Sequence, residues 1–116
     1  GAKSVLATDL DAVAVRVAAD NVRINGFEGV IETRCGDLLE AVDAVGDVVI
    51  ANIIADVILM LAKPVREHVE EGGLFICSGI ANDRRDEVLA ALKDADYQVL
   101  DVMEKGEWTA IASRKC

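Results

Sequence analysis

The fold class follows from the stretch Asp47-Val48-Val49-Ile50-Ala51-Asn52, in which four consecutive apolar residues lie between two polar ones. A strand of a parallel sheet has a continuous apolar run because helices cover both of its faces, whereas a strand with one wet face alternates. We therefore expect residues 47–52 to form a central parallel strand. Leu74 to Ser78 has the same character and predicts a second buried strand.

Strands and helices alternate upstream of these two segments. Val5 to Thr8 predicts a strand, apolar residues three and four apart in 15–22 predict a helix, and Val30 to Cys35 predicts the next strand. Asn25-Gly26 is suited to a left-handed turn and is expected to end the helix. This segment therefore predicts a strand, a helix and a second strand in succession.

The alternation continues downstream of the central strand. Apolar residues at helical spacing in 58–69 predict a helix that is interrupted at Pro64, where a new first turn can begin. Gly72-Gly73 is expected to end this helical segment before the strand at 74–78. Asp83 to Ala95 repeats the helical pattern and predicts a further helix.

The last segment predicts an antiparallel hairpin formed by Tyr97 to Glu104 and Trp108 to Ser113, with Trp108 packing the hairpin on the sheet. The whole order of elements is that of an α/β fold. We expect a doubly wound, Rossmann-like and mostly parallel sheet, with helices on both faces and the antiparallel hairpin at one edge. Such sheets bind their ligands at the carboxyl ends of the strands.

Composition limits the kinds of function that the chain can have. A length of 116 residues, 53% of them apolar, predicts one globular domain. A formal net charge of -9 disfavours a direct nucleic-acid partner and favours a basic protein partner. Three widely spaced cysteines and one histidine give no clustered ligands, so we expect no metal site. The chain shows no membrane segment and no secretion signal, which predicts a cytoplasmic protein.

Three of the predicted strands finish in polar residues, which form the candidate site. Asp9 ends the first strand, where a carboxylate commonly accepts both hydroxyls of a nucleoside ribose. The alternative is that Asp9 or Asp11 caps the following helix through its free backbone N–H groups. Asp37 can accept a hydrogen bond from an adenine amino group or be an ordinary loop acid, and the residues leave this open.

Asn52 is the most informative of these polar residues. An amide at the end of a buried apolar strand needs hydrogen-bond partners or a ligand, which favours a position in the cleft. The alternative is that Asn52 caps the helix that starts near Ile54. The chain has no Walker loop, no nucleophile elbow around Ser78 and no histidine beside a cysteine, so hydrolase chemistry lacks its usual groups.

Several segments together resemble known enzymes. Gly1 to Asp11, followed by Asn25-Gly26, resembles class I S-adenosylmethionine-dependent methyltransferases just after their glycine-rich loop. Asp47 to Ala55, Ser78-Gly79-Ile80 and Gly106-Glu107-Trp108 resemble the ribosomal protein methyltransferases of the PrmA type. The resemblance covers essentially all 116 residues. It implies S-adenosylmethionine as cofactor and methylation of amines, both lysine side chains and the amino terminus, on large-subunit ribosomal protein eleven.

The resemblance also implies a role for each candidate residue. Asp9 is expected to hold the cofactor ribose, and Asp37 with Leu38 to flank the adenine. Asn52 is expected to lie beside the transferred methyl group and the incoming amine, where Ile53 contributes backbone contacts. Methyl transfer from a sulfonium needs a neutral amine held close to the carbon, so positioning does most of the catalysis and no strong general base is required.

The resemblance implies that residues 1–116 are the carboxyl-terminal part of a single methyltransferase domain. The family's first strand and its glycine-rich loop are expected upstream of Gly1, with the strand lying between those beginning at Val5 and Asp47. Without that strand the chain is expected to be unstable alone. Alternatives are a methyltransferase of this fold for another substrate, a nucleotide-binding or interaction domain without activity, and a nicotinamide-dependent oxidoreductase. The oligomeric state stays open.

Overall fold

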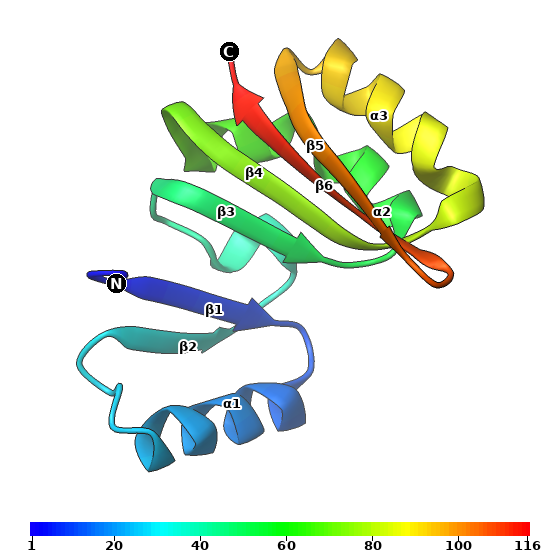
Figure 1. Cartoon of the computed structure of the whole chain (residues 1–116). Helices are drawn as coiled ribbons and strands as arrows, with labels where there is room; N and C mark the ends of the chain where they lie inside the picture. Colours follow the sequence, from blue (N-terminus) through cyan, green and yellow to red (C-terminus); the bar gives the residue numbers. More distant parts are fainter. The chain divides into compact units, whose positions relative to one another are not determined.

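The computed structural model describes the backbone of residues 1–116 and every side chain except those of Leu38 and Ala41. The chain divides into two units, Gly1–Asp43 and Ala44–Cys116. Both units contain a pair of parallel strands and at least one helix (Figure 1). The predicted α/β class is therefore confirmed, and each unit is described here by itself.

The first unit consists of β1 (Val5–Asp9), α1 (Ala12–Ile24), β2 (Ile31–Cys35) and the short 3-10 helix η1 (Leu38–Ala41). Strands β1 and β2 are parallel and aligned from Val5 opposite Ile31 to Asp9 opposite Cys35. Helix α1 ends at Asn25, and Gly26 follows with φ of 77°, a left-handed conformation that glycine adopts without strain. The predicted elements of this segment are confirmed.

The second unit is a four-stranded sheet with two helices on one face. Its elements are β3 (Gly46–Asn52), α2 (Ala55–Leu61), η2 (Pro64–His68), β4 (Val69–Ala81), η3 (Asn82–Arg84), α3 (Arg85–Asp94), β5 (Tyr97–Lys105) and β6 (Trp108–Lys115). The strand order is β3-β4-β6-β5, in which β3 and β4 are parallel while β6 is antiparallel to both of its neighbours. Helices α2 and α3 contact one another and the sheet (Figure 1). The predicted hairpin at one edge is confirmed.

The core of the second unit lies between the sheet and these two helices. Alternate residues of the strands point into it, as the two-residue period of a strand requires. The fully buried side chains include Ile58, Val88, Leu92, Phe75, Ile80 and Ile111. The one buried serine of this core, Ser113, donates its hydroxyl to the Phe75 carbonyl over 2.9 Å, so burial leaves no orphaned hydroxyl there.

Two details of the predicted strands are wrong. Gly72-Gly73 does not end a helix, because η2 stops at His68 and β4 begins at Val69, which pairs with Gly46. The glycines instead lie where the register between β3 and β4 shifts, and Gly73 is packed so closely that a Cβ would lie 2.8 Å from the Glu70 carbonyl oxygen. Sequence periodicity cannot show such a bulge, since it depends on the partner strand.

Strand β3 is also not covered on both faces within its unit. It is an edge strand of the four-stranded sheet, and Val48 and Ile50 are 50% and 67% exposed. Val49 and Ala51, on the opposite face, are partly buried. No helix among the described residues is long and apolar enough to cross a membrane.

Candidate functional site

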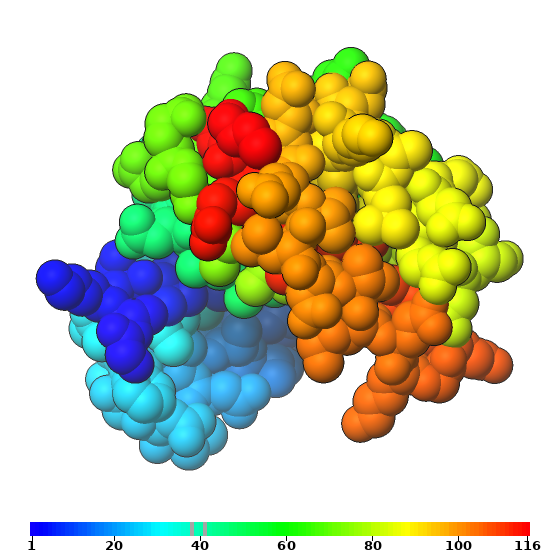
Figure 2. Space-filling model, turned by 45° about the horizontal axis from the view of Figure 1, so that its top comes forward, coloured from blue at the N-terminus to red at the C-terminus, as the bar shows by residue number. Residues whose placement is uncertain are grey.

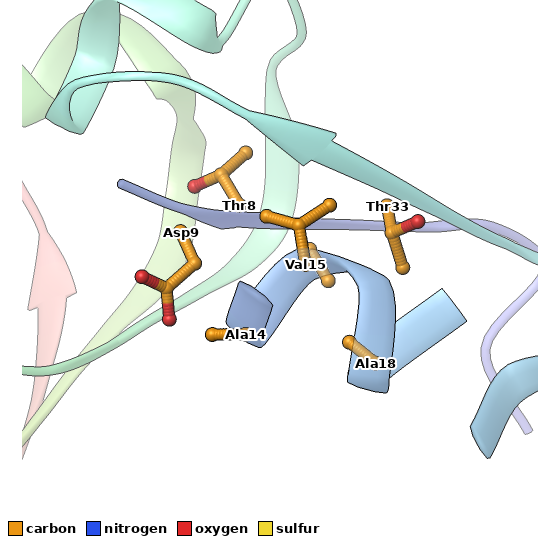
Figure 3. Close-up of a pocket in the computed structure, with 7 residues that line it drawn as sticks. Thr8, Asp9, Ala14, Val15, Ala18 and Thr33 are labelled. Carbon is orange, nitrogen blue, oxygen red and sulfur yellow. The ribbon is translucent and has the colours of Figure 1, made fainter. Parts of the chain in front are cut away.

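The first candidate residue, Asp9, lies at the carboxyl end of β1 (Figure 3). Its side chain is exposed, and its Oδ1 accepts the Asp11 N–H over 2.9 Å. The helix cap is Asp11, whose Oδ1 accepts the Val13 N–H over 2.9 Å. The structure thus divides the two roles that the sequence left open: Asp11 caps α1, and Asp9 binds the backbone N–H of that cap residue through Oδ1, which leaves its other carboxylate oxygen without a role in the cap.

A small hollow adjoins Asp9 between β1 and α1. Its volume is about 100 Å³, and Figure 3 shows that α1 contributes small side chains to it. It is lined by Ala7, Thr8, Asp9, Ala14, Val15, Ala18 and Thr33. This volume is well below that of a typical ligand pocket, so the hollow is a packing gap and Asp9 must bind any nucleoside from its exposed side.

Asp37 lies at the same end of the first unit as Asp9. The Gly36 N–H donates to the Asp9 carbonyl over 3.0 Å, which fixes the backbone just before Asp37 beside the end of β1. The Asp37 side chain is exposed and makes no capping hydrogen bond to η1, although it occupies the cap position. The two predicted cofactor carboxylates are therefore brought together, and the side chain of Leu38 lies outside the described residues.

Asn52 ends β3 in the second unit, opposite Ser78 of β4. The side chain of Asn52 is exposed, because β3 is an edge strand of the four-stranded sheet. Asn52 does not cap α2 either, since the cap residue is Ile54 and no side chain bonds to that helix start. The Asn52 amide is therefore free to meet a ligand from solvent.

The residues after Asn52 form the floor of an open hollow of about 490 Å³. Its lining consists of Asn52, Ile53, Ile54, Gly79 and Trp108. The Ile53 N–H donates to the Ser78 carbonyl over 3.2 Å, which continues the β3–β4 pairing for one residue and holds the Ile53 backbone in place. The predicted catalytic pair Asn52 and Ile53 thus shares one hollow of a size suited to a side chain of a substrate.

Trp108 forms a wall of this hollow and does not pack the hairpin on the sheet as predicted, because 55% of it is exposed. Asn82 fixes the turn that carries it: Asn82 Nδ2 donates to the Gly106 carbonyl over 2.9 Å, and the Thr109 hydroxyl donates to Asn82 Oδ1 over 2.6 Å. The exposed turn at Gly106 projects from the surface of its unit (Figure 2). Trp108 is thus held on an anchored turn with its ring available.

Two ionisable groups of the second unit have shifted pKa values with clear structural causes. Arg84 donates to Asp56 over 2.6 Å and to Glu87, and these hydrogen bonds, that to Glu87 first, hold the pKa of Arg84 above its usual range. Burial raises the pKa of the Cys77 thiol to about 12, so Cys77 is protonated at neutral pH and is no nucleophile. Among the described residues, no group of three His, Cys, Asp or Glu is arranged to hold a metal ion.

Sequence reasoning found the polar strand ends but missed two members of the hollow. Trp108 was predicted to pack the hairpin on the sheet, and its 55% exposed fraction shows otherwise. Gly79 carried no signal beyond its place in a family-like tripeptide. Its positive φ of 76° and its closeness to Asn52 depend on the register of β3 and β4, which the sequence does not state.

The fold matches that of solved methyltransferases. A crystal structure described as ribosomal protein L11 methylase from Lactobacillus delbrueckii subsp. bulgaricus matches with a TM-score of 0.92 and 34% sequence identity. The match covers 100% of this chain and 60% of that chain. This chain therefore has the Rossmann-like fold of a class I methyltransferase.

The family is narrower than the fold. The model of the family described as ribosomal protein L11 methyltransferase (PrmA) matches residues 1–116. The ribosomal protein L11 methyltransferases of Thermoanaerobacter pseudethanolicus and Listeria innocua are 44% and 41% identical, each over 99% of this chain and 37% of their own length. The chain belongs to the ribosomal protein L11 methyltransferase family, which confirms the resemblance, and it spans about 37% of the length of these relatives.

Proposed function

We propose that this chain carries cofactor-binding and catalytic residues of an S-adenosylmethionine-dependent methyltransferase that modifies amines of ribosomal protein L11, on lysine side chains and the amino terminus. The observation that carries the proposal is the exposed Asn52 amide in an open hollow at the carboxyl end of β3. Membership of this family, and relatives that are ribosomal protein L11 methyltransferases, support the reaction and the substrate. The net charge of -9 fits a basic protein substrate in a cytoplasmic setting.

The first unit supplies groups that fit the cofactor. S-adenosylmethionine supplies an electrophilic methyl group when it is bound. Asp9 is exposed at a strand end with a carboxylate oxygen beyond the one that binds the Asp11 N–H, which suits the two hydroxyls of a ribose. Asp37 is exposed at the same end and is not used as a helix cap, so it is available to the adenine amino group, with Leu38 as its neighbour.

The second unit supplies groups that fit the methyl acceptor. Asn52 Oδ1 is a hydrogen-bond acceptor that can hold an amine N–H and so point the nitrogen lone pair away from itself. The Ile53 backbone, fixed by its hydrogen bond to Ser78, borders the same hollow. The ring of Trp108 offers an apolar wall against which the alkyl part of an amine side chain can pack. These residues position the amine, and positioning is the main requirement of this displacement.

The extent of the match bears on the architecture of the whole protein. The chain covers 37% of the length of its relatives, and the family model matches all of its 116 residues. We propose that residues 1–116 are the carboxyl-terminal part of a single methyltransferase domain. The first strand and glycine-rich loop of that domain would then belong to the upstream part of the longer protein.

The test is methylation of ribosomal protein L11 by the full-length protein and its Asn52→Ala variant. Asn21→Ala is the matched control, since it removes an exposed amide from α1. We expect Asn52→Ala to lower kcat by roughly 100-fold, because a misplaced acceptor loses the advantage of positioning. Asn21→Ala should keep the rate of the unmodified protein. Mass spectrometry of L11 reports the number and location of methyl groups.

Titration of S-adenosylhomocysteine separates catalysis from binding. We expect Asn52→Ala to bind it nearly as well as the unmodified protein, whereas Asp9→Ala should weaken binding by about tenfold or more through loss of hydrogen bonds to a charged group. Full methylation activity in Asn52→Ala would refute the catalytic role. Methylation of another protein in preference to L11 would refute the substrate assignment but not the assignment of a methyl-transfer reaction.

A further inference from the structure

We infer that Gly79 is a positioning residue for the reaction: the absence of a side chain at this position sets where the Asn52 carboxamide lies. The inference rests on the proposed function, because that function assigns Asn52 the role of holding the amine. Gly79 itself need not touch the substrate. It acts through the one side chain that the hollow offers as an acceptor of amine N–H groups.

The contact between the two residues is short. A Cβ added to Gly79 would lie 2.7 Å from Asn52 Oδ1, closer than two such atoms can approach without movement. The next neighbours, the carbonyl oxygen and the nitrogen of Ile53, would lie at 3.4 and 3.6 Å, which are ordinary contact distances. The overlap therefore falls on Asn52 alone, and the carboxamide can relieve it by rotating away from its present position.

The backbone around Gly79 cannot move to relieve the overlap instead. Asn52 and Ser78 are paired in β3 and β4, and the Ile53 N–H donates to the Ser78 carbonyl over 3.2 Å. On the other side of β4, pairing with β6 resumes at Ile80 after an irregularity that begins at Cys77. Gly79 thus sits in a local bulge whose two ends are fixed by neighbouring strands, and bulges of this kind commonly re-aim side chains at active sites.

Gly72 provides a matched control for the backbone. Its φ is 75° and that of Gly79 is 76°, so alanine imposes the same conformational cost at both positions. Gly72 lies in the same strand, β4, and a Cβ there would meet no atom within 4 Å. Gly72→Ala therefore measures the backbone cost alone, whereas Gly79→Ala adds the displacement of Asn52.

The test compares Gly79→Ala, Gly72→Ala, Asn52→Ala and the double variant Asn52→Ala with Gly79→Ala in the full-length protein. We expect Gly79→Ala to lower kcat about 10- to 100-fold more than Gly72→Ala, with a smaller change in KM. In the Asn52→Ala background the additional effect of Gly79→Ala on kcat should vanish, because the carboxamide through which Gly79 acts is absent. Equal kcat in Gly79→Ala and Gly72→Ala would overturn the inference.

A second readout does not use activity. The side-chain amide resonances of Asn52, identified as those missing from the Asn52→Ala spectrum of protein labelled with ¹⁵N, should shift in Gly79→Ala and keep their positions in Gly72→Ala. Unshifted Asn52 resonances in Gly79→Ala would overturn the inference. If the resonances shift but Asn52→Ala is fully active, the contact is real and it is the proposed function of Asn52 that fails.

Discussion

The two units of the chain are both built from parallel strands and helices, but they bury their apolar side chains to different degrees. In the second unit, 14 apolar residues are buried, among them Ile58, Phe75 and Leu92. In the first unit, none of the described side chains is buried, and α1 contributes no buried residue. A parallel strand pair with one helix therefore satisfies backbone hydrogen bonds without producing a core of its own.

The difference in burial follows from the number of helices and strands that pack against one another in each unit. In the second unit, α2 and α3 pack side by side against four strands, so each helix is covered by a strand and by the other helix. In the first unit, α1 covers two strands only, and Val13 and Val17 on its far side are 54% and 52% exposed.

Truncating one phenylalanine in each unit tests this comparison and has the largest expected effect. Phe75 is fully buried, so Phe75→Ala should lower the free energy of unfolding by about 3–5 kcal/mol. Phe27, in the first unit, is 50% exposed, so Phe27→Ala should cost less than about 1 kcal/mol. Urea unfolding followed by circular dichroism measures both, and equal costs would contradict the difference in burial.

Hydrogen exchange examines the same contrast without substitutions. The amides of β1 and β2 are expected to exchange at least about 100-fold faster than those of β4 and β6, equivalent to roughly 3 kcal/mol in opening free energy. Strands without a buried core open locally, whereas β4 and β6 open only with their core. Mass spectrometry of peptides from residues 1–116 of the full-length protein gives the rates. Similar protection in the two strand pairs would mean that both units unfold together.

The smallest expected effect concerns Tyr97, a buried residue of the second unit. Tyr97 is 4% exposed, Arg66 lies 5.4 Å from its ring centroid, and among the described residues its hydroxyl has no hydrogen-bond partner. Since an unsatisfied buried hydroxyl is costly, Tyr97→Phe should raise the free energy of unfolding at pH 7 by about 1 kcal/mol. A loss of stability in Tyr97→Phe would show that the hydroxyl is satisfied.

The same residue predicts a dependence of stability on pH. Burial raises the pKa of the Tyr97 hydroxyl from its usual value of about 10 to about 12. The unfolded chain therefore ionises first, so this contribution to stability is complete below pH 10 and is lost as the pH rises toward 12. Tyr97→Phe should flatten that part of the stability curve. The Cys77 thiol, whose pKa burial also raises, remains in both proteins and serves as the internal reference.

The elements of the fold could be predicted because they depend on local pattern. Asp11 and Gly26 mark the two ends of α1 as capping rules require, and Pro64 restarts a helical turn as η2. The extent of β4 could not be predicted, because Val69 belongs to it only through its pairing with Gly46. Pairing between distant segments, rather than propensity, decides where such a strand begins.

The candidate site, like the fold, could be predicted only where it depends on local sequence pattern. Asp9 and Asp37 could be placed together because parallel strands finish at a common edge. The exposure of Asn52 and the roles of Gly79 and Trp108 could not, because they depend on which strand is at an edge and on a bulge in β4. The type of residue at a strand end thus indicates which chemistry is possible there. The neighbours that orient that residue are determined by the register between strands, which the sequence does not show.

The position of β6 has a consequence for synthesis of the protein. This strand, Trp108–Lys115, comes last among the elements but lies between β4 and β5 in the sheet. As a nascent chain leaves the ribosome, β4 already has its partner β3, whereas β5 gains its partner only as residues 108–115 emerge. The hairpin strand Tyr97–Lys105 therefore waits unpaired during translation, which is the stage at which an exposed edge is most open to aggregation.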